Sequence, residues 1–145
     1  QAVRDTVFSL ATRQWQQEWD NSENNILYSY FPSIQQRLAA KWLVPNHYTS
    51  QFLTGHGNFK AKLFQLGIPS IPSAECACGA SSQDVPHVLW DCPLLHPNRV
   101  ALLSAVRPAI GPVGYADLVA TKSNFSAFQR FCASFCQAAS AADPQ

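Results

Sequence analysis

Apolar residues recur at every fourth position along the beginning of the chain. The residues with this spacing are Val3, Val7, Ala11, Trp15 and Trp19. Because arginine and glutamine side chains fill other faces, the pattern predicts an amphipathic helix that runs to about Trp19. The polar segment at 20–22 (Asp-Asn-Ser) suits a turn, so we expect the helix to end there.

A second, shorter helix is predicted after Pro32. Ser33 can cap a helix that continues through Leu38 to Leu43. Pro45 lacks a backbone N–H and should end this helix.

Residues 46–67 have the pattern of a helix-turn-helix pair. Asn46 is a candidate N-cap for the first helix, which the Gly-His-Gly segment at 55–57 interrupts. Asn58 is expected to cap the second helix, and Gly67 lies at its end.

The remainder of the chain also favours helices. Pro93 to Val106 has helical apolar spacing, and residues 115–120 fit one or two helical turns. The last helix should start near Ser123 and Asn124 and run to about Ala142. Because alternating strand-like patterns are scarce, the predicted fold class is mostly α.

The composition is that of a folded domain. The chain has 145 residues, of which 47% are hydrophobic and 13% are charged, so it can bury a core. The formal net charge is only +1. A basic surface spread over the whole chain is therefore excluded, and binding to nucleic acid would have to rest on a local patch.

The sequence contains no methionine and begins with Gln1, which suggests a segment of a longer polypeptide. It shows no charged-then-apolar leader and no apolar run near the ~20 residues of a membrane helix, so we expect no membrane partner. Three of the five cysteines lie close to a histidine in one short stretch. This arrangement favours metal binding over disulfides. It also favours an intracellular compartment, the nucleus or the cytoplasm.

The candidate metal site occupies residues 76–92. Cys76, Cys78, His87 and Cys92 form the pattern C-x-C-x8-H-x4-C. Structural zinc takes four nitrogen or sulfur ligands in a tetrahedron, and Gly79 permits a tight turn behind the first two cysteines. We therefore predict one Zn²⁺ in a small helical domain. The domain has a helical region at 1–75, a zinc knuckle at 76–93 and C-terminal helices at 94–145.

The second half of the motif needs an irregular helix. Pro86 suits the start of a helical turn, with Asp84 as its cap. His87 and Cys92 are five residues apart, or about 140° around an ideal α-helix. They can share a metal only if the helix unwinds near Cys92, which Pro93 favours. The alternative is a set of ordinary buried cysteines beside a surface histidine.

Cys132 and Cys136 lie four residues apart on the last predicted helix, a spacing that can also hold a metal. Phe125, Phe128 and Phe135 share their apolar stripe. Since free cysteine behaves as a small hydrophobic residue, we predict core packing, with a second ligand pair as the alternative.

The expected nucleic-acid surface is centred on His56, Lys60 and Lys62, where lysines gather without acidic neighbours. The free N–H groups at the start of the second paired helix can bind a phosphate, whereas the alternative is a plain interhelical turn. Three further cations are candidate neighbours: Arg37, Lys41 and Arg99.

The remaining histidines, the tryptophans and the possible catalytic groups give weaker indications of function. His96 is an alternative ligand, and we expect His47 to be solvated. The tryptophans at 15, 19, 42 and 90 fall on apolar faces, which favours the core over base stacking. Neither a nucleophile–base–orienter trio nor a two-metal carboxylate arrangement stands out, so we predict no catalytic activity.

Four segments in order resemble the C-terminal region of non-LTR retrotransposon polyproteins, in particular jockey-like and related arthropod elements. They are WQQEWD at 15–20, LTGHGNF at 53–59, CACG at 76–79 and HVLWDCP at 87–93. The match runs from about Gln14 to Arg99. In that family the region follows the reverse transcriptase and, in many members, an RNase H domain, and it ends in a CCHC zinc knuckle.

The resemblance implies that Cys76, Cys78, His87 and Cys92 are the knuckle ligands. It implies a non-catalytic accessory part of an enzyme polyprotein, or a degraded or repurposed copy of one. The implied partners are RNA or DNA and the upstream domains of the same polyprotein. The alternative is a structural or protein-interaction domain, stapled by zinc, that docks on the polymerase/RNase H part. Many family members have a basic tail, whereas here the C-terminus is alanine-rich and nearly uncharged.

Overall fold

A computed structural model describes residues 1–142. Within that range the chain forms helices joined by loops and contains no strand, which confirms the mostly α fold class. None of the helices described there is long and apolar enough to span a bilayer.

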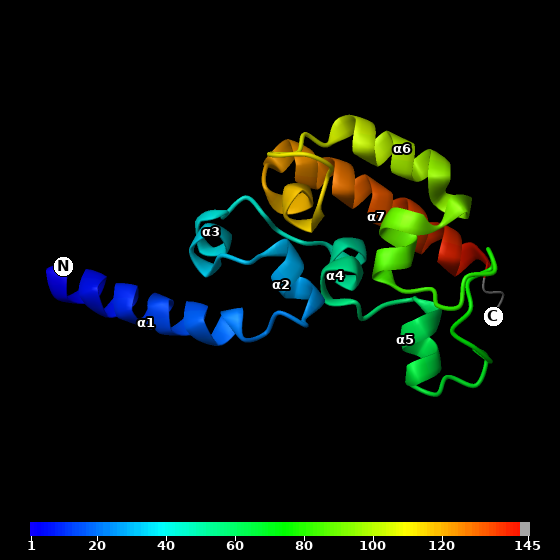
Figure 1. Ribbon diagram of the computed structural model, residues 1–145, viewed down its shortest axis with the longest axis horizontal. Helices are drawn as coiled ribbons and strands as arrows, with labels where there is room; N and C mark the ends of the chain where they lie inside the picture. The colour runs from blue at the N-terminus through cyan, green and yellow to red at the C-terminus, as the bar shows by residue number, and fades with distance from the viewer. Residues whose placement is uncertain (143–145) are drawn as a thin grey trace.

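The elements follow one another along the chain as shown in Figure 1. The α-helices are α1 (Ala2–Asp20), α2 (Ile26–Tyr30), α3 (Ile34–Ala39), α4 (His47–Thr54), α5 (Lys60–Gln65), α6 (His96–Ala105) and α7 (Lys122–Ala142). Three shorter elements complete the set: a π-helical turn η1 (His87–Asp91) and two 3-10 turns, η2 (Pro93–Leu95) and η3 (Tyr115–Val119).

The core is built around α7, which packs against α4, α6 and η3. Phe52 of α4 lies at its centre and is fully buried. Its ring centroid is 5.1 Å from that of Phe59, 6.1 Å from Phe128 and 5.6 Å from Phe135. Tyr30 extends this aromatic cluster, and its hydroxyl donates to the Phe52 carbonyl at 3.1 Å. These contacts fix the helix-turn-helix pair on the C-terminal helix.

The helix-turn-helix pair is confirmed, with one change in its capping. Asn46 caps α4 through the Thr49 N–H, and Gly55 ends the helix with φ 72°. The expected cap of α5 is wrong, because Phe59, not Asn58, is the N-cap residue. The N–H groups of Lys60 and Ala61 at the start of the helix donate to the side-chain and backbone oxygens of Gln83, so the Asn58 side chain does not cap them. The Asn58 N–H donates to the side-chain oxygen of Gln51 instead.

Two other predicted boundaries move. Ser33 caps α3 as expected, but the helix ends at Ala39, before Leu43. Leu43 is only 2% exposed, so the chain must leave the helix to place this side chain in the core. The predicted helix from Pro93 is divided into η2 and α6, whereas the last helix and the turn at η3 agree with prediction.

Helix α1 extends away from the other helices (Figure 1), and none of its residues is buried. Its end is attached by hydrogen bonds and by one aromatic contact. Trp19 Nε1 donates to the Phe31 carbonyl at 2.6 Å, Gln16 bonds to Pro32 and Ile34, and the Trp19 ring packs on Tyr28. Trp15 is 49% exposed, so the prediction that it enters the core is wrong. The same holds for Trp42, at 37% exposure, whereas Trp19 and Trp90 are half-buried.

Candidate metal centre

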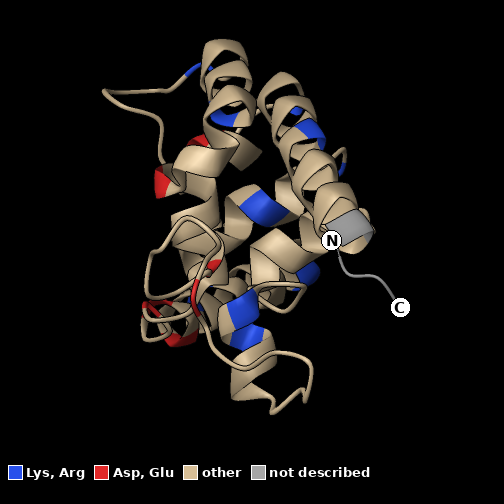
Figure 2. Ribbon diagram, turned by 90° about the vertical axis from the view of Figure 1, so that its right-hand side faces the viewer, with Lys and Arg blue, Asp and Glu red and all other residues tan. Residues whose placement is uncertain are grey.

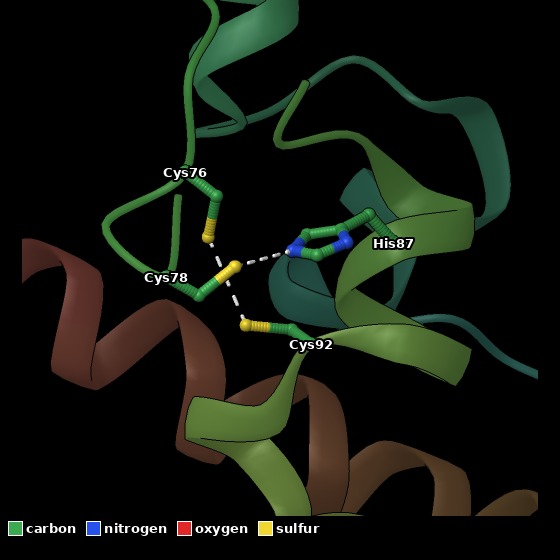
Figure 3. A group of neighbouring side chains, drawn as sticks. All are labelled: Cys76, Cys78, His87 and Cys92. Carbon is green, nitrogen blue, oxygen red and sulfur yellow. Dashed lines mark hydrogen bonds between the residues drawn. The ribbon is translucent and has the colours of Figure 1, made fainter. Parts of the chain in front are cut away.

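The chain brings together the four predicted ligands from two segments (Figure 3). Cys76 and Cys78 lie on the loop after α5, and His87 and Cys92 lie at the two ends of the η1 turn. One ligand atom from each side chain falls within 4.8 Å of all the others. The Cys76/Cys78 pair and the His87/Cys92 pair, which are far apart in sequence, therefore converge on one point.

Two of the distances between these atoms are close to those of a tetrahedral metal site. The Sγ atoms of Cys76 and Cys92 are 3.7 Å apart, and Cys78 Sγ is 3.3 Å from His87 Nε2. Zinc bonds of about 2.3 Å to sulfur and 2.0–2.1 Å to nitrogen place tetrahedral ligands about 3.5–3.8 Å apart. A disulfide needs a much shorter separation, about 2.05 Å. The cluster therefore fits the embedded zinc knuckle predicted from the sequence.

A π-helical turn brings His87 and Cys92 to the same side. The Cys92 N–H donates to the His87 carbonyl at 2.7 Å, across five residues. A π-turn is wider than an α-turn, so residues five apart come close to alignment. The predicted departure from ideal helix geometry is confirmed. The predicted cap of this turn is also confirmed, because Asp84 Oδ1 accepts from the His87 N–H at 3.0 Å.

The first cysteine pair lies on a tight turn. The Gly79 N–H donates to the Cys76 carbonyl at 2.9 Å, and Gly79 has φ 97°, a left-handed conformation that favours glycine. Beyond the turn, the Cys76 N–H donates to the Ala80 carbonyl at 3.0 Å. The Gln83 side-chain amide lies 3.9 Å from Cys76 Sγ. The two backbone hydrogen bonds therefore shape the loop, and the Gln83 amide is directed at a ligand sulfur.

Backbone donors also change the acidity of the cysteines. Burial raises the pKa of Cys76, but hydrogen bonds from the Cys78 N–H and from the side chains of His87, Cys78 and Cys92 lower it by more. The resulting pKa of Cys76 is about 7, below its usual value. Burial raises the pKa of Cys92, opposed by the Leu94 N–H. Donors directed at sulfur stabilise a thiolate, the form that binds metal. The donors around Cys76 therefore favour its metal-binding form.

The cysteines of α7 have a different environment. Cys132 is fully buried and Cys136 is 2% exposed, and both belong to the aromatic core. Burial raises the pKa of both thiols, that of Cys136 to about 11. Neither belongs to the metal-binding group found among the described residues. Their prediction as core residues is confirmed.

The cations proposed for nucleic-acid binding are not all neighbours. His56 is exposed in the α4–α5 turn, and Lys60 and Lys62 are half-buried on α5. Arg37 lies on α3, which α2 and α4 separate from α5 (Figure 1), with its guanidinium 5.3 Å from the Phe31 ring centroid. Exposed Lys41 follows α3 closely. Figure 2 shows basic residues distributed over several helices and not collected on one face.

Arg99 does not belong to any exposed patch, so its prediction as a nucleic-acid contact is wrong. Its side chain is 8% exposed, and all three guanidinium nitrogens donate to backbone carbonyls near the cluster. The sequence does contain a signal for this. Leu95, Leu102 and Val106 lie at helical spacing from Arg99 and define an inward face. His96 and His47 are both exposed, and neither joins the metal-binding group.

Curated relatives of the chain are retrotransposon proteins. The chain is 32% identical, over 128 residues and 86% of its length, to the Retrovirus-related Pol polyprotein from type-1 retrotransposable element R1 4 of Nasonia vitripennis. It is 36% identical over 59% of its length to the R1 Pol polyprotein of Bradysia coprophila. For that of Popillia japonica the identity is 30% over 62% of the chain.

These relatives extend beyond the matched segment. The match covers 32% of the length of the Nasonia vitripennis protein, 8% of that of Bradysia coprophila and 35% of that of Popillia japonica. No protein-family model matches the chain. No solved structure matches it either. The relatives confirm the predicted resemblance to non-LTR retrotransposon polyproteins.

Proposed function

We propose that this chain, a homologue of part of the Pol polyproteins of R1 retrotransposable elements, is a zinc-stapled module that assists nucleic-acid binding. The convergence of three cysteines and one histidine within 4.8 Å carries the proposal. The module has no catalytic activity of its own. It works within the nucleus or cytoplasm, where its thiols stay reduced.

The ligand set supports a structural metal. Cys76, Cys78, His87 and Cys92 supply four ligands, which fills the tetrahedral coordination of zinc. A catalytic zinc keeps one position open for water or substrate, and this set leaves none. The bound ion would fix the loop after α5 to the η1 turn, and through η1 to α6.

The nucleic-acid role rests on the polyprotein context and on a small basic patch. We define the α5 patch as His56, Lys60 and Lys62. Each phosphate neutralised contributes about 0.9 to the slope of log affinity against log salt for duplex DNA. The two lysines of the patch give a slope of about 2 and weak binding. Tight binding then requires the rest of the polyprotein, through effective concentration.

A titration of labelled RNA and DNA at two salt concentrations tests this role. The double variant Lys60→Ala/Lys62→Ala should bind more weakly than wild type and lose its salt dependence. Lys122→Ala/Arg130→Ala is the matched control, because it removes two exposed cations from α7. Equal binding by all three proteins would exclude the α5 patch. No binding by wild type at low salt would exclude the nucleic-acid role.

A second candidate function has its own support in helix α1. Val3, Val7 and Leu10 are 56–76% exposed on this extended helix. A cleft of about 360 Å³ opens between α1 and the helices that follow it, lined by Trp15, Trp19 and Leu53 among others. Apolar surface of this kind suits a protein partner. In this function, zinc holds the helices together, and the module docks on the polymerase or RNase H part of its polyprotein.

A binding assay separates the two functions. The probe is a fragment of the same polyprotein that contains its reverse transcriptase and RNase H domains. Val7→Glu/Leu10→Glu should abolish binding if α1 is the docking surface, while Lys60→Ala/Lys62→Ala should not affect it. Retention of binding by the α1 variant would contradict the docking function.

A further inference from the structure

We propose that Arg99 is a positioning residue for the metal centre, holding the η1 turn in its ligand-bearing conformation and offsetting the charge of the bound site. The inference rests on the proposed zinc function. Arg99 lies on α6, outside the ligand motif, and its contacts are with the segment that carries His87 and Cys92.

The guanidinium of Arg99 bonds to three carbonyls of that segment. Nε donates to Leu89 at 2.9 Å, Nη1 to Cys92 at 2.9 Å, and Nη2 to Val88 at 3.0 Å. All three nitrogens therefore bind backbone within one turn of the ligand Cys92. The planar guanidinium is suited to this, since its donors have fixed relative directions.

Two of these carbonyls, those of Val88 and Leu89, lack the donors that a continuing helix would supply. In the π-helical pattern Val88 would accept from residue 93, but Pro93 has no N–H. Leu89 would accept from Leu94, whose N–H points to the Cys92 sulfur. The geometry that serves the metal ligand thus leaves two buried carbonyls unpaired. Arg99 pairs both, and a buried unpaired carbonyl would be costly.

Charge gives a second reason for an arginine at this position. Three thiolates and a neutral histidine around Zn²⁺ carry a net charge of −1. Arg99 is buried, and none of its three bonds goes to a carboxylate. A buried cation without an acidic partner is unfavourable, unless another negative charge lies nearby. The metal centre supplies that negative charge. Arg99 lies close to it, because its Nη1 bonds to the backbone carbonyl of the ligand Cys92.

Arg99 should therefore increase the affinity for zinc without touching the metal. Loss of such supporting contacts typically lowers metal affinity about 10–100-fold. Arg99→Met removes the charge and all donors while keeping an unbranched stem, so we expect a loss in the upper part of this range. Arg99→Lys keeps the charge but cannot reach three carbonyls together, so we expect a loss near tenfold.

The test measures zinc affinity by competition with a chromogenic chelator, and the Co²⁺ absorption spectrum, for wild type and both variants. Arg107→Met is the matched control. Arg107 is exposed just beyond α6, and its hydrogen bonds with Asn124 come from backbone atoms. Circular dichroism checks the helices of each variant with and without metal. A merely structural role would lower stability with and without metal equally, leaving affinity and spectrum unchanged.

Graded loss of affinity, with an altered cobalt spectrum in the Arg99 variants and wild-type values in Arg107→Met, supports the inference. Unchanged affinity in a folded Arg99→Lys overturns it. If Arg99→Met fails to fold, Arg99→Lys decides. If both fail to fold even with zinc, Arg99 is a general core residue and the inference is wrong. Failure of wild type itself to bind zinc would instead reject the proposed zinc function.

Discussion

The two groups of cysteines in this chain have the same chemistry but opposite environments. Cys76, Cys78 and Cys92 lie among backbone and side-chain donors, next to His87. Cys132 and Cys136 lie among phenylalanine rings on α7. The first environment lowers the pKa of Cys76 to about 7, whereas burial in the second raises the pKa of both thiols. Donors supplied by loop and turn backbone, more than cysteine spacing alone, distinguish a metal ligand from a core residue.

Removal of zinc should produce the largest difference between the two regions. A chelator should abolish hydrogen-exchange protection around residues 76–95, because zinc coordination supplies much of the order in this segment. Helix α7 should keep its protection, since its aromatic contacts do not involve the metal. Hydrogen exchange measured by mass spectrometry checks this, and one equivalent of zinc should restore the protection. Equal loss along the whole chain would show that the metal supports the core as well.

Thiol labelling should separate the two groups next. With chelator at pH 8, iodoacetamide should label Cys76 readily, because the loss of order around residues 76–95 exposes a thiol that is buried in the folded site. Cys136, whose burial raises its pKa to about 11, should stay protonated and unlabelled until the protein unfolds. Mass spectrometry of peptides gives the rates. Rapid labelling of Cys136 in the folded protein would contradict the description of α7.

The smallest effect is expected from a substitution in the core group. Cys132→Ala should keep its zinc and lose about 1 kcal/mol in the free energy of unfolding, as a small buried truncation does. Urea denaturation measures the change. Ser134→Ala, at an exposed position of the same helix, is the control and should change stability by less than about 0.5 kcal/mol. Loss of metal from Cys132→Ala would mean that the two groups are coupled.

Local signals in the sequence predicted much of this architecture. The caps Ser33 and Asn46 act where their side chains were expected to, and the phenylalanine stripe of α7 enters the core. The spacing of His87 and Cys92 required an irregular helix, which is present as a π-turn. These features depend on residues close together in the chain, so one sequence is enough to predict them.

Features that depend on distant segments were harder to predict. Asn58 does not cap α5 because Gln83, more than 20 residues further along the chain, accepts from the N–H groups of Lys60 and Ala61. Trp15 follows a helical apolar pattern, yet no core exists on that side of α1. The spacing of Leu95, Leu102 and Val106 indicates that Arg99 faces inward, but the carbonyls that it pairs are visible only in the folded chain. Tertiary packing determines all three.

The most direct test of the central claim is the metal content of the purified protein. The account predicts about one zinc per chain in wild type, about one in Cys132→Ala, and less than about a tenth in Cys92→Ser, because a structural site needs all four ligands. Elemental analysis with a protein assay gives these ratios. Wild type with less than about a tenth of an equivalent, or Cys92→Ser that folds normally and keeps its zinc, would contradict the account.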